Sequence, residues 1–250
     1  MKKLGYIFIL TLLFSCSGEN VPDCFQNAGS IVEVDFTVET FDKITVFERI
    51  ELIIKDSPIQ EVVVETGEYL LNEIEVYVED GRLNLRNDNG CNLVRDYGIT
   101  KVYVSSPNLT EIRNASGQIV SSDGVLDYEM LTLISEDFRV DEGFYHTDGD
   151  FDLEVNSNSI SINTNDISNV FMKGTVNDLN IRFFSGDGRF EGSNLIAQNI
   201  NIFHRGSNDM IINPQQSLTG EIRSTGNVIS VNQPPIVDVE EFYTGTLIFN

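Results

Sequence analysis

The sequence predicts an all-β protein whose body is a parallel β-helix (a solenoid), with a more irregular β-rich N-terminal half. Three observations support this fold class. Apolar and polar residues alternate from Ile44 onward, short apolar segments recur at intervals near 20 residues in the second half, and no stretch of 12 residues sustains an apolar stripe of helical spacing. An ordinary β-sandwich with regular strand spacing is the alternative, because strand spacing alone does not determine topology.

Residues 1–15 have the features of a lipoprotein signal peptide. Lys2 and Lys3 precede an apolar run over 4–14, which is too short for a bilayer core that needs roughly 20 residues. The segment 13–16, Leu-Phe-Ser-Cys, resembles a bacterial lipoprotein signal box, so we expect Cys16 to become the lipid-carrying N-terminal residue. Residues 16–29 then form the lipidated cysteine and a tether, and residues 30–250 the folded domain. An ordinary secretory signal with a chance cysteine is the alternative.

These features predict an outer membrane lipoprotein. More than one acyl chain gives durable anchoring, whereas one chain alone is marginal. Glu19 and Asp23 in the tether resemble the acidic surface-export signals of Bacteroidetes lipoproteins. Display at the cell surface and a body facing the periplasm both stay open.

The charge balance excludes some classes of partner. Sixteen Lys and Arg against 39 Asp and Glu give a formal charge of −23. Proteins that track nucleic-acid phosphates need a basic face, so we expect no nucleic-acid partner. Removal of Lys2 and Lys3 with the signal peptide leaves 14 − 39 = −25. An anionic membrane would repel such a body, so the lipid must provide the membrane contact.

Short alternating runs predict the strands of the first half. They are separated by turn residues, and Asp80-Gly81 between two alternating runs is a hairpin signal. The apolar positions of these runs are Ile44/Val46, Leu52/Ile54, Val62/Val64, Ile74/Val76/Val78, Leu83/Leu85 and Val102/Val104.

The second half has a different pattern, in which apolar segments recur between corners rich in Gly, Asn, Asp and Ser. A period near 20 with short strands favours stacked parallel coils, because one coil cannot bury its own apolar face. Such stacking also allows like polar residues, here many Asn, to form ladders. The segments are 131–133, 151–153, 179–181, 200–202 and 218–222.

Two cysteines remain after the signal region. Cys24 and Cys91 would meet an oxidising compartment after export, so we expect a disulfide that closes a loop of 91 − 24 = 67 residues. Two unpaired thiols are the alternative.

A series of loose motifs, in a specific order, runs through nearly all of the mature chain. They are 41–46 (Phe-Asp-Lys-Ile-Thr-Val), 76–85 with its Asp-Gly-Arg-Leu end, 102–104, 107–109, 112–117 (Ile-Arg-Asn-Ala-Ser-Gly), 185–190 (Ser-Gly-Asp-Gly-Arg-Phe) and 226–229 (Gly-Asn-Val-Ile). In this order the sequence resembles the putative auto-transporter adhesin, head GIN domain family of Bacteroidetes lipoproteins. The resemblance implies a right-handed β-helical body and an envelope location, and it transfers no catalytic residue. Residues 226–229 lack the small-residue repeat common there in the family.

No motif predicts a catalytic or cofactor-binding site. The glycine-rich segment 186–192 has one residue too many for a dinucleotide loop, and no helix follows it. His204 lies near Ser207 and Asp209, but crowding within one turn does not make a triad, and there is no nucleophile elbow. We expect His204 and His146 to be hydrogen-bonded corner residues.

Alternating carboxylates offer a weak metal candidate. Asp148, Asp150 and Asp152 would share one face of an extended chain, and Ca²⁺ takes such oxygen ligands. A solvated acidic face is the usual interpretation of such a run. We therefore expect no cofactor, and Ca²⁺ at these three aspartates is the alternative.

Together these features predict a non-enzymatic, lipid-anchored envelope protein for adhesion, or for binding a glycan or an envelope protein. Exposed Tyr and Asn on successive coils would provide the contacts. A carbohydrate-active β-helix enzyme, either a lyase or a hydrolase, is the second hypothesis, and a periplasmic structural or signalling partner is the third. Fold alone does not distinguish among them.

Overall fold

The structure is a computed structural model that describes residues 23–91, 93, 98–137 and 146–250. The predicted signal peptide over 1–15, Cys16 and residues 17–22 of the predicted tether lie outside the described residues. Very little of the described part of the chain is helical. The two short 3₁₀ helices are η1 (Asp23–Phe25) and η2 (Leu71–Glu73).

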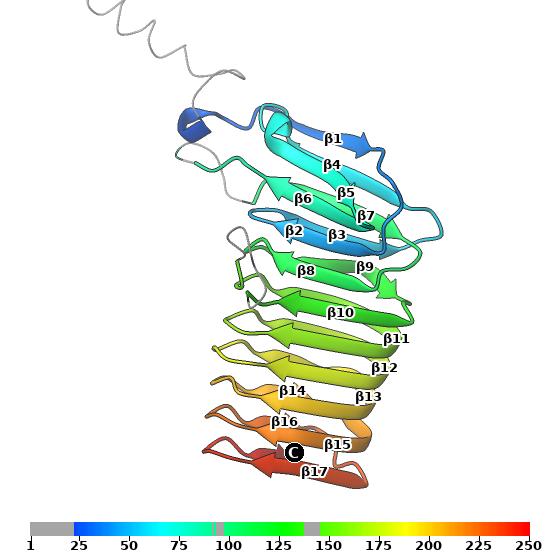
Figure 1. Ribbon diagram of the computed structural model, residues 1–250, viewed down its shortest axis with the longest axis vertical. Coiled ribbons are helices and arrows are strands. Elements are labelled where there is room, and N and C mark those ends of the chain that lie inside the picture. The colour runs from blue at the N-terminus through cyan, green and yellow to red at the C-terminus, as the bar shows by residue number, and fades with distance from the viewer. Residues whose placement is uncertain (1–22, 92, 94–97, 138–145) are drawn as a thin grey trace, which may run out of the picture.

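Strands make up the rest of the regular structure, and they are stacked along the long axis of the molecule from β1 at one end to β17 at the other (Figure 1). The strands of the first half are β1 (Ile31–Phe36), β2 (Lys43–Phe47), β3 (Glu51–Asp56), β4 (Glu61–Gly67), β5 (Ile74–Glu79), β6 (Arg82–Asn87), β7 (Lys101–Ser106), β8 (Glu111–Ala115) and β9 (Val120–Leu126). Those of the second half are β10 (Met130–Ser135), β11 (Phe151–Thr164), β12 (Val170–Phe183), β13 (Phe190–His204), β14 (Met210–Ile212), β15 (Pro214–Ile222), β16 (Val228–Ser230), β17 (Ile236–Glu241) and β18 (Leu247–Phe249).

The all-β class is as predicted, but the predicted architecture, a right-handed parallel β-helix, is wrong. The 18 strands belong to one mixed sheet that is nearly closed into a barrel shape. β1 pairs with β4, β4 with β7, and β5 with β6 in antiparallel orientation. Strands β8 to β18 have parallel neighbours, so both orientations occur in the same sheet.

The β5–β6 hairpin shows why the sheet cannot be purely parallel. A two-residue turn can join only antiparallel strands, because a parallel connection needs a crossover of a dozen or more residues. Asp80 and Gly81 form that turn with φ of 49° and 73°, and Glu79 is opposite Arg82 in the register. The hairpin prediction is confirmed. Regular spacing in the second half indicated which strands are neighbours, but it carried no information on how the whole sheet curves and closes.

Alternating burial builds the core. In β11 the even spacing places Ile160 and Ile162 inside, with Ser159 and Ser161 facing outward. The parallel register then aligns buried residues of successive strands, as in Ile160, Leu179, Ile200 and Leu218. Each of these side chains is at most 1% exposed. The apolar segments singled out in the sequence therefore all contribute to one continuous core.

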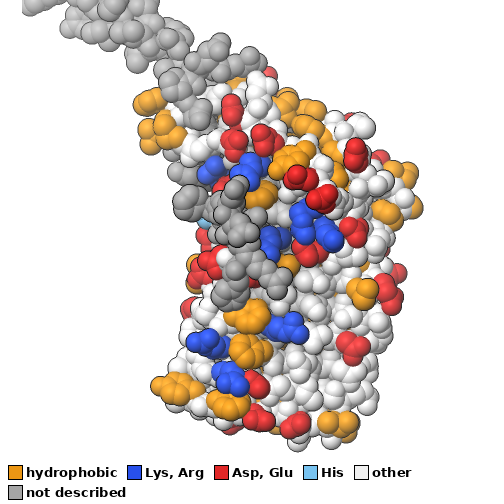
Figure 2. Space-filling model, viewed as in Figure 1, with side chains coloured by type: hydrophobic (Ala, Val, Ile, Leu, Met, Phe, Trp, Pro, Cys, Tyr) orange, Lys and Arg blue, Asp and Glu red, His pale blue; other side chains and the backbone are white. Residues whose placement is uncertain are grey.

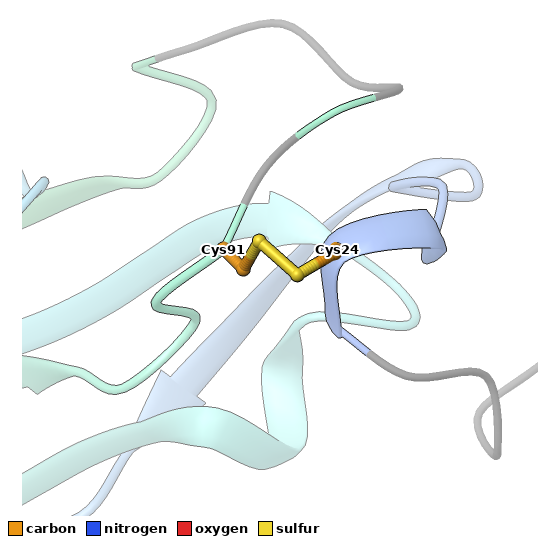
Figure 3. The surroundings of a disulfide bond; sticks show 2 residues. All are labelled: Cys24 and Cys91. Carbon is orange, nitrogen blue, oxygen red and sulfur yellow. A yellow bond between two sulfur atoms is a disulfide. The ribbon is translucent and has the colours of Figure 1, made fainter.

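A disulfide joins Cys24 in η1 to Cys91, which lies in the segment after β6 (Figure 3). The bonded residues are 67 positions apart, so the bond ties the first described segment of the chain to the end of the β5–β6 hairpin. A backbone hydrogen bond of 3.0 Å from Leu93 N to Cys24 O lies beside it.

Candidate ligand-binding face

Polar side chains, seven of them amides or hydroxyls and one the carboxylate of Asp178, form two parallel rows across one outer face of the sheet. They project from the second halves of β11, β12 and β13 and from β15, and the register sets them side by side. The first row is Ser159, Asp178, Asn199 and Ser217, and the second is Ser161, Asn180, Asn201 and Thr219. We call these eight residues the polar ladder. Strands β13, β15 and β17 cross the front in Figure 1, and the same area in Figure 2 is mostly white.

Hydrogen bonds between the rungs hold this ladder in place. Asn199 Nδ2 donates to Asp178 Oδ1 at 3.0 Å, and Ser217 Oγ donates to Asn199 Oδ1 at 2.8 Å. Asn201 Nδ2 donates to Thr219 Oγ1 at 2.9 Å. A shallow hollow of about 340 Å³ lies over these side chains. Amides and hydroxyls both donate and accept, so this surface can hydrogen-bond a ligand rich in hydroxyl groups.

A second polar hollow lies at the bend between the two halves of β11 and β12. Its volume is about 300 Å³. Thr175 Oγ1 donates to Asn156 Oδ1 at 2.7 Å, and Asn177 Nδ2 donates to Asn158 Oδ1 at 2.9 Å. Asn156 Nδ2 also donates to Asp127 Oδ1 at 2.9 Å. The hollow therefore continues the amide and hydroxyl groups beyond the ladder and adds the carboxylates of Asp127 and Glu129.

On the side away from this second hollow, the polar ladder borders a pocket of about 560 Å³ that contains three arginines. It is lined by Arg82, Glu111, Arg113, Ile134, Glu136, Asn163, Arg182 and Phe184. Arg82 Nη2 lies 2.6 Å from Glu111 Oε1, and Arg113 Nη2 lies 3.2 Å from Glu136 Oε1. Within the described part of the chain, Arg182 has no carboxylate within ion-pair distance, so it supplies the uncompensated positive charge of this pocket.

The three aspartates predicted as weak calcium ligands do not converge. Asp150 Oδ1 accepts hydrogen bonds from Asn169 N at 2.8 Å and from Asn169 Nδ2 at 3.1 Å. Asp148 lies 3.8 Å from His146 Nδ1, and Asp152 is on β11 opposite Phe171. Among residues 23–91, 93, 98–137 and 146–250, no group of three His, Cys, Asp or Glu side chains is arranged to hold a metal ion. Binding of Ca²⁺ stays a prediction.

The two histidines occupy contrasting environments. His146 is exposed, whereas His204 is fully buried at the end of β13. The His204 ring donates from Nε2 to the Asn208 carbonyl at 2.9 Å and packs edge-on against Phe183, with ring centroids 6.2 Å apart. Burial lowers the pKa of His204, and the Asn208 hydrogen bond and the charge of Asp209 oppose this shift. A ring enclosed in this way supports the core and has no access to a substrate.

Arg182 and Phe184 were not singled out from the sequence. The signal that could have found them is the repeat itself: Phe184, Arg205, Arg223 and Phe242 follow one another at intervals of 21, 18 and 19 residues. Aligning the chain at this period puts large aromatic and basic residues in one column. The apolar pattern of the core does not reveal this column, because its four side chains point outward.

The fold and these surfaces define an all-β protein with an extended polar face. Residues 40–234 match the family described as putative auto-transporter adhesin, head GIN domain, and the chain belongs to this family. The resemblance found in the sequence is thus confirmed. Membership in this adhesin-like family indicates a protein of the cell envelope or surface, and it supports a non-enzymatic, adhesion-like role.

Solved structures share this fold. A putative adhesin from Bacteroides fragilis NCTC 9343 has a TM-score of 0.78 and 19% identity, over 90% of this chain and 99% of that one. A putative lipid binding protein from Parabacteroides distasonis ATCC 8503 has a TM-score of 0.62 and 14% identity, over 89% of this chain and 97% of that one. A putative adhesin from Parabacteroides merdae ATCC 43184 has the same TM-score and coverage at 15% identity.

Comparison with curated proteins gives no match. Among the described residues, no helix is long and apolar enough to cross a membrane.

Proposed function

We propose that this chain is an outer membrane lipoprotein that binds saccharides through the polar ladder and catalyses no reaction on them. The observation that carries this proposal is the run of amide and hydroxyl groups over four neighbouring strands, continuous in the row from Ser161 to Thr219 and joined by the Asp178 carboxylate in the other row. A saccharide presents hydroxyl groups along its length, so a row of paired donors and acceptors matches its chemistry. Family membership supports an adhesion-like role, and the predicted lipid on Cys16 would hold the body at the membrane.

The anchor is tested by fractionating cells that produce the wild-type chain or Cys16→Ser. We expect the wild type in the membrane fraction and the variant in the soluble fraction, because acylation needs the Cys16 thiol. Cys24→Ser is the matched control, since it removes a different cysteine and should leave the chain in the membrane. A Cys16→Ser chain that stays in the membrane would contradict lipid anchoring.

The orientation is tested by protease treatment of intact cells, followed by immunoblotting for the C-terminal half. Loss of signal, with an intracellular control protein uncut, supports surface adhesion. Protection that disappears only when the outer membrane is opened contradicts an adhesin at the surface and favours an envelope partner.

Saccharide binding is tested with the mature full-length chain, purified in detergent, on a printed array of microbial, plant and host glycans. We expect Asn180→Ala/Asn201→Ala to weaken binding about tenfold, since each lost hydrogen bond contributes about 0.5–1.5 kcal/mol. The control Asn194→Ala/Asn213→Ala removes two amides from outside the ladder and should bind like the wild type. Equal losses in both variants would contradict a role for the ladder.

The same array also tests Ca²⁺. Repeating it with EGTA should leave binding unchanged if the ladder acts alone. A loss with EGTA that Ca²⁺ restores, and that Asp148→Asn abolishes, would support the weak calcium prediction. Turnover of any bound glycan would contradict the non-enzymatic proposal.

A further inference from the structure

Aromatic and basic side chains gather along one border of the ligand-binding face. Six residues near the ends of β12, β13, β15 and β17 form this border: Arg182, Phe184, Phe203, Arg205, Arg223 and Phe242. We call them the Arg–Phe stripe. Backbone hydrogen bonds from Arg205 N to Phe183 O, from Arg223 N to His204 O and from Phe242 N to Ile222 O hold the strand ends side by side. Orange and blue side chains lie close together along the lower left of this face in Figure 2.

The aromatic rings of the stripe contact one another and one of its arginines. The rings of Phe184 and Phe203 have centroids 5.8 Å apart. The Arg223 guanidinium carbon lies 4.1 Å from the Phe242 ring centroid and 5.9 Å from that of Phe203. These distances are within the cation–π range, so Arg223 orders the rings around it. The Arg223 Nε also donates to Glu221 Oε2.

The other two arginines of the stripe are differently placed. Arg182 and Arg205 are exposed, and within the described part of the chain neither guanidinium lies within 4.0 Å of a carboxylate. Lys55, Lys101 and Lys173, by contrast, each lie within that distance of one. Two uncompensated guanidinium groups at adjacent strand ends therefore create a local positive site.

The positive charge of the stripe contrasts with the acidic composition of the rest of the molecule. The whole chain carries −23, and the described residues after 130 include only five Lys and Arg, three of which are in the stripe. The repulsion from distant carboxylates is screened beyond about 8 Å at physiological ionic strength. Glu221 and Glu240 continue the row of Arg182 and Phe203 and lie beside Arg223, so the stripe attracts an anionic group at Arg182 and Arg205 rather than at Arg223.

The stripe directly adjoins the polar ladder. Asn180 precedes Arg182 by two residues on the same face of β12, and Asn201 precedes Phe203 by two on β13. The pocket of about 560 Å³ continues from Arg182 and Phe184 to Asn163. A saccharide on the ladder would thus reach a flat ring for stacking, an amide for its hydroxyls, and a guanidinium fork that fits a carboxylate or sulfate.

We infer that the Arg–Phe stripe makes this face selective for saccharides that carry carboxylate or sulfate groups. The inference rests on the proposed function and extends it. The polar ladder binds the sugar, and the Arg–Phe stripe distinguishes anionic saccharides from neutral ones. The ligand class is an anionic glycan, for which charge complementarity at Arg182 and Arg205 and stacking at Phe184 are the recognising features.

The experiment uses the mature full-length chain in detergent, immobilised through a C-terminal tag, with dextran and dextran sulfate of equal length as probes at 150 mM NaCl. We expect dextran sulfate to bind at least about tenfold more tightly than dextran, because charge-assisted hydrogen bonds are about twice as strong as neutral ones. Arg182→Gln/Arg205→Gln should remove that preference. The matched control Lys173→Gln/Arg189→Gln loses the same charge away from the stripe and should keep it.

A third variant tests stacking. Phe184→Leu retains apolar volume without a ring, and we expect several-fold weaker binding of dextran sulfate while the affinity for inorganic sulfate is unchanged. Unchanged dextran sulfate binding in this variant would show that the Phe184 ring does not contribute to binding.

The outcomes separate the inference from the proposed function. Ladder-dependent binding of dextran with no preference for dextran sulfate overturns the inference and leaves saccharide binding intact. Equal losses in the two double variants overturn the assignment to the stripe. Stripe-dependent binding of phosphatidylglycerol vesicles as tight as that of dextran sulfate overturns the saccharide commitment. Failure of both dextrans and of every array glycan to bind overturns the proposed function itself.

Discussion

His204 shows how one buried side chain couples stability to pH. Its Nε2 donates to the Asn208 carbonyl, and its Nδ1 has no hydrogen-bond partner among the described residues. Protonation would place a charge and an unsatisfied N–H inside the core. The folded state therefore holds the pKa of His204 below its ordinary value of about 6.5. The stability that the neutral ring contributes is present above that value and is lost as the pH falls toward the lower, folded-state pKa.

We predict that the free energy of unfolding falls more steeply between pH 7.5 and 5 in the wild type than in His204→Gln. Urea denaturation at a series of pH values measures this difference. His146→Gln, which removes an exposed ring, is the control and should follow the wild type. Parallel pH profiles for the wild type and His204→Gln would show that the buried ring does not titrate in this range.

Gly220 shows a backbone requirement that a side chain cannot meet. Its φ is +125°, and an added Cβ would lie 2.0 Å from the Ile202 carbonyl oxygen of the neighbouring strand. Gly124 has φ of +88° but nothing within 4 Å of an added Cβ. We predict that Gly220→Ala destabilises the fold by more than 3 kcal/mol, whereas Gly124→Ala costs about 1–3 kcal/mol from backbone strain alone. Equal losses in urea denaturation would mean that the sheet relaxes around the clash.

At the scale of elements, the disulfide connects η1 to the segment that follows β6. Cross-linking residues 67 positions apart removes unfolded-state entropy that corresponds to about 4 kcal/mol. We predict that Cys24→Ser/Cys91→Ser lowers the free energy of unfolding by about that amount. Dithiothreitol should lower the wild type to the same level and leave the double variant unchanged. An effect below about 1 kcal/mol would indicate that η1 detaches without affecting the sheet.

The strands illustrate what local pattern can and cannot predict. Alternation around Ile44, Leu52, Val62 and Leu83 located β2, β3, β4 and β6, because period two follows directly from the pleat. Asp80-Gly81 located a hairpin for the equally local reason of turn geometry. The antiparallel pairing of β1 with β4 joins Ile31 to Gly67, and no turn signal connects segments so far apart. Their pairing depends on the closure of the whole sheet.

The candidate site, too, was predictable from local sequence patterns only in part. The sequence indicated that Asn residues would form ladders, and the hydrogen bond from Asn177 to Asn158 is one such contact. It did not show that Arg182 would lie beside Phe203 of the next strand, because that pairing depends on a register shift in the first half of β12 and β13. A one-residue slip would turn either side chain to the other face of the sheet.

At the scale of the whole molecule, the charge of −23 affects stability. Self-repulsion destabilises a compact acidic body, and salt screens it. We predict that the urea midpoint at pH 7.5 rises as NaCl increases from 20 to 500 mM. Lys173→Gln/Arg189→Gln, with two fewer positive charges, should show a larger rise. A midpoint that falls with salt would indicate that ion pairs such as Arg113–Glu136 outweigh the general repulsion.

Local periodicity, motif order and composition were enough to predict the all-β class, most strand positions, the family and the negative charge. The mixed, nearly closed sheet and the neighbours of each outward-facing residue follow only from the folded arrangement of the strands. Burial restricts core positions to apolar residues, so the pattern of core positions can be recognised in the sequence. Surface neighbours such as Arg182 and Phe203 are constrained only through register and closure, which are properties of the assembled sheet.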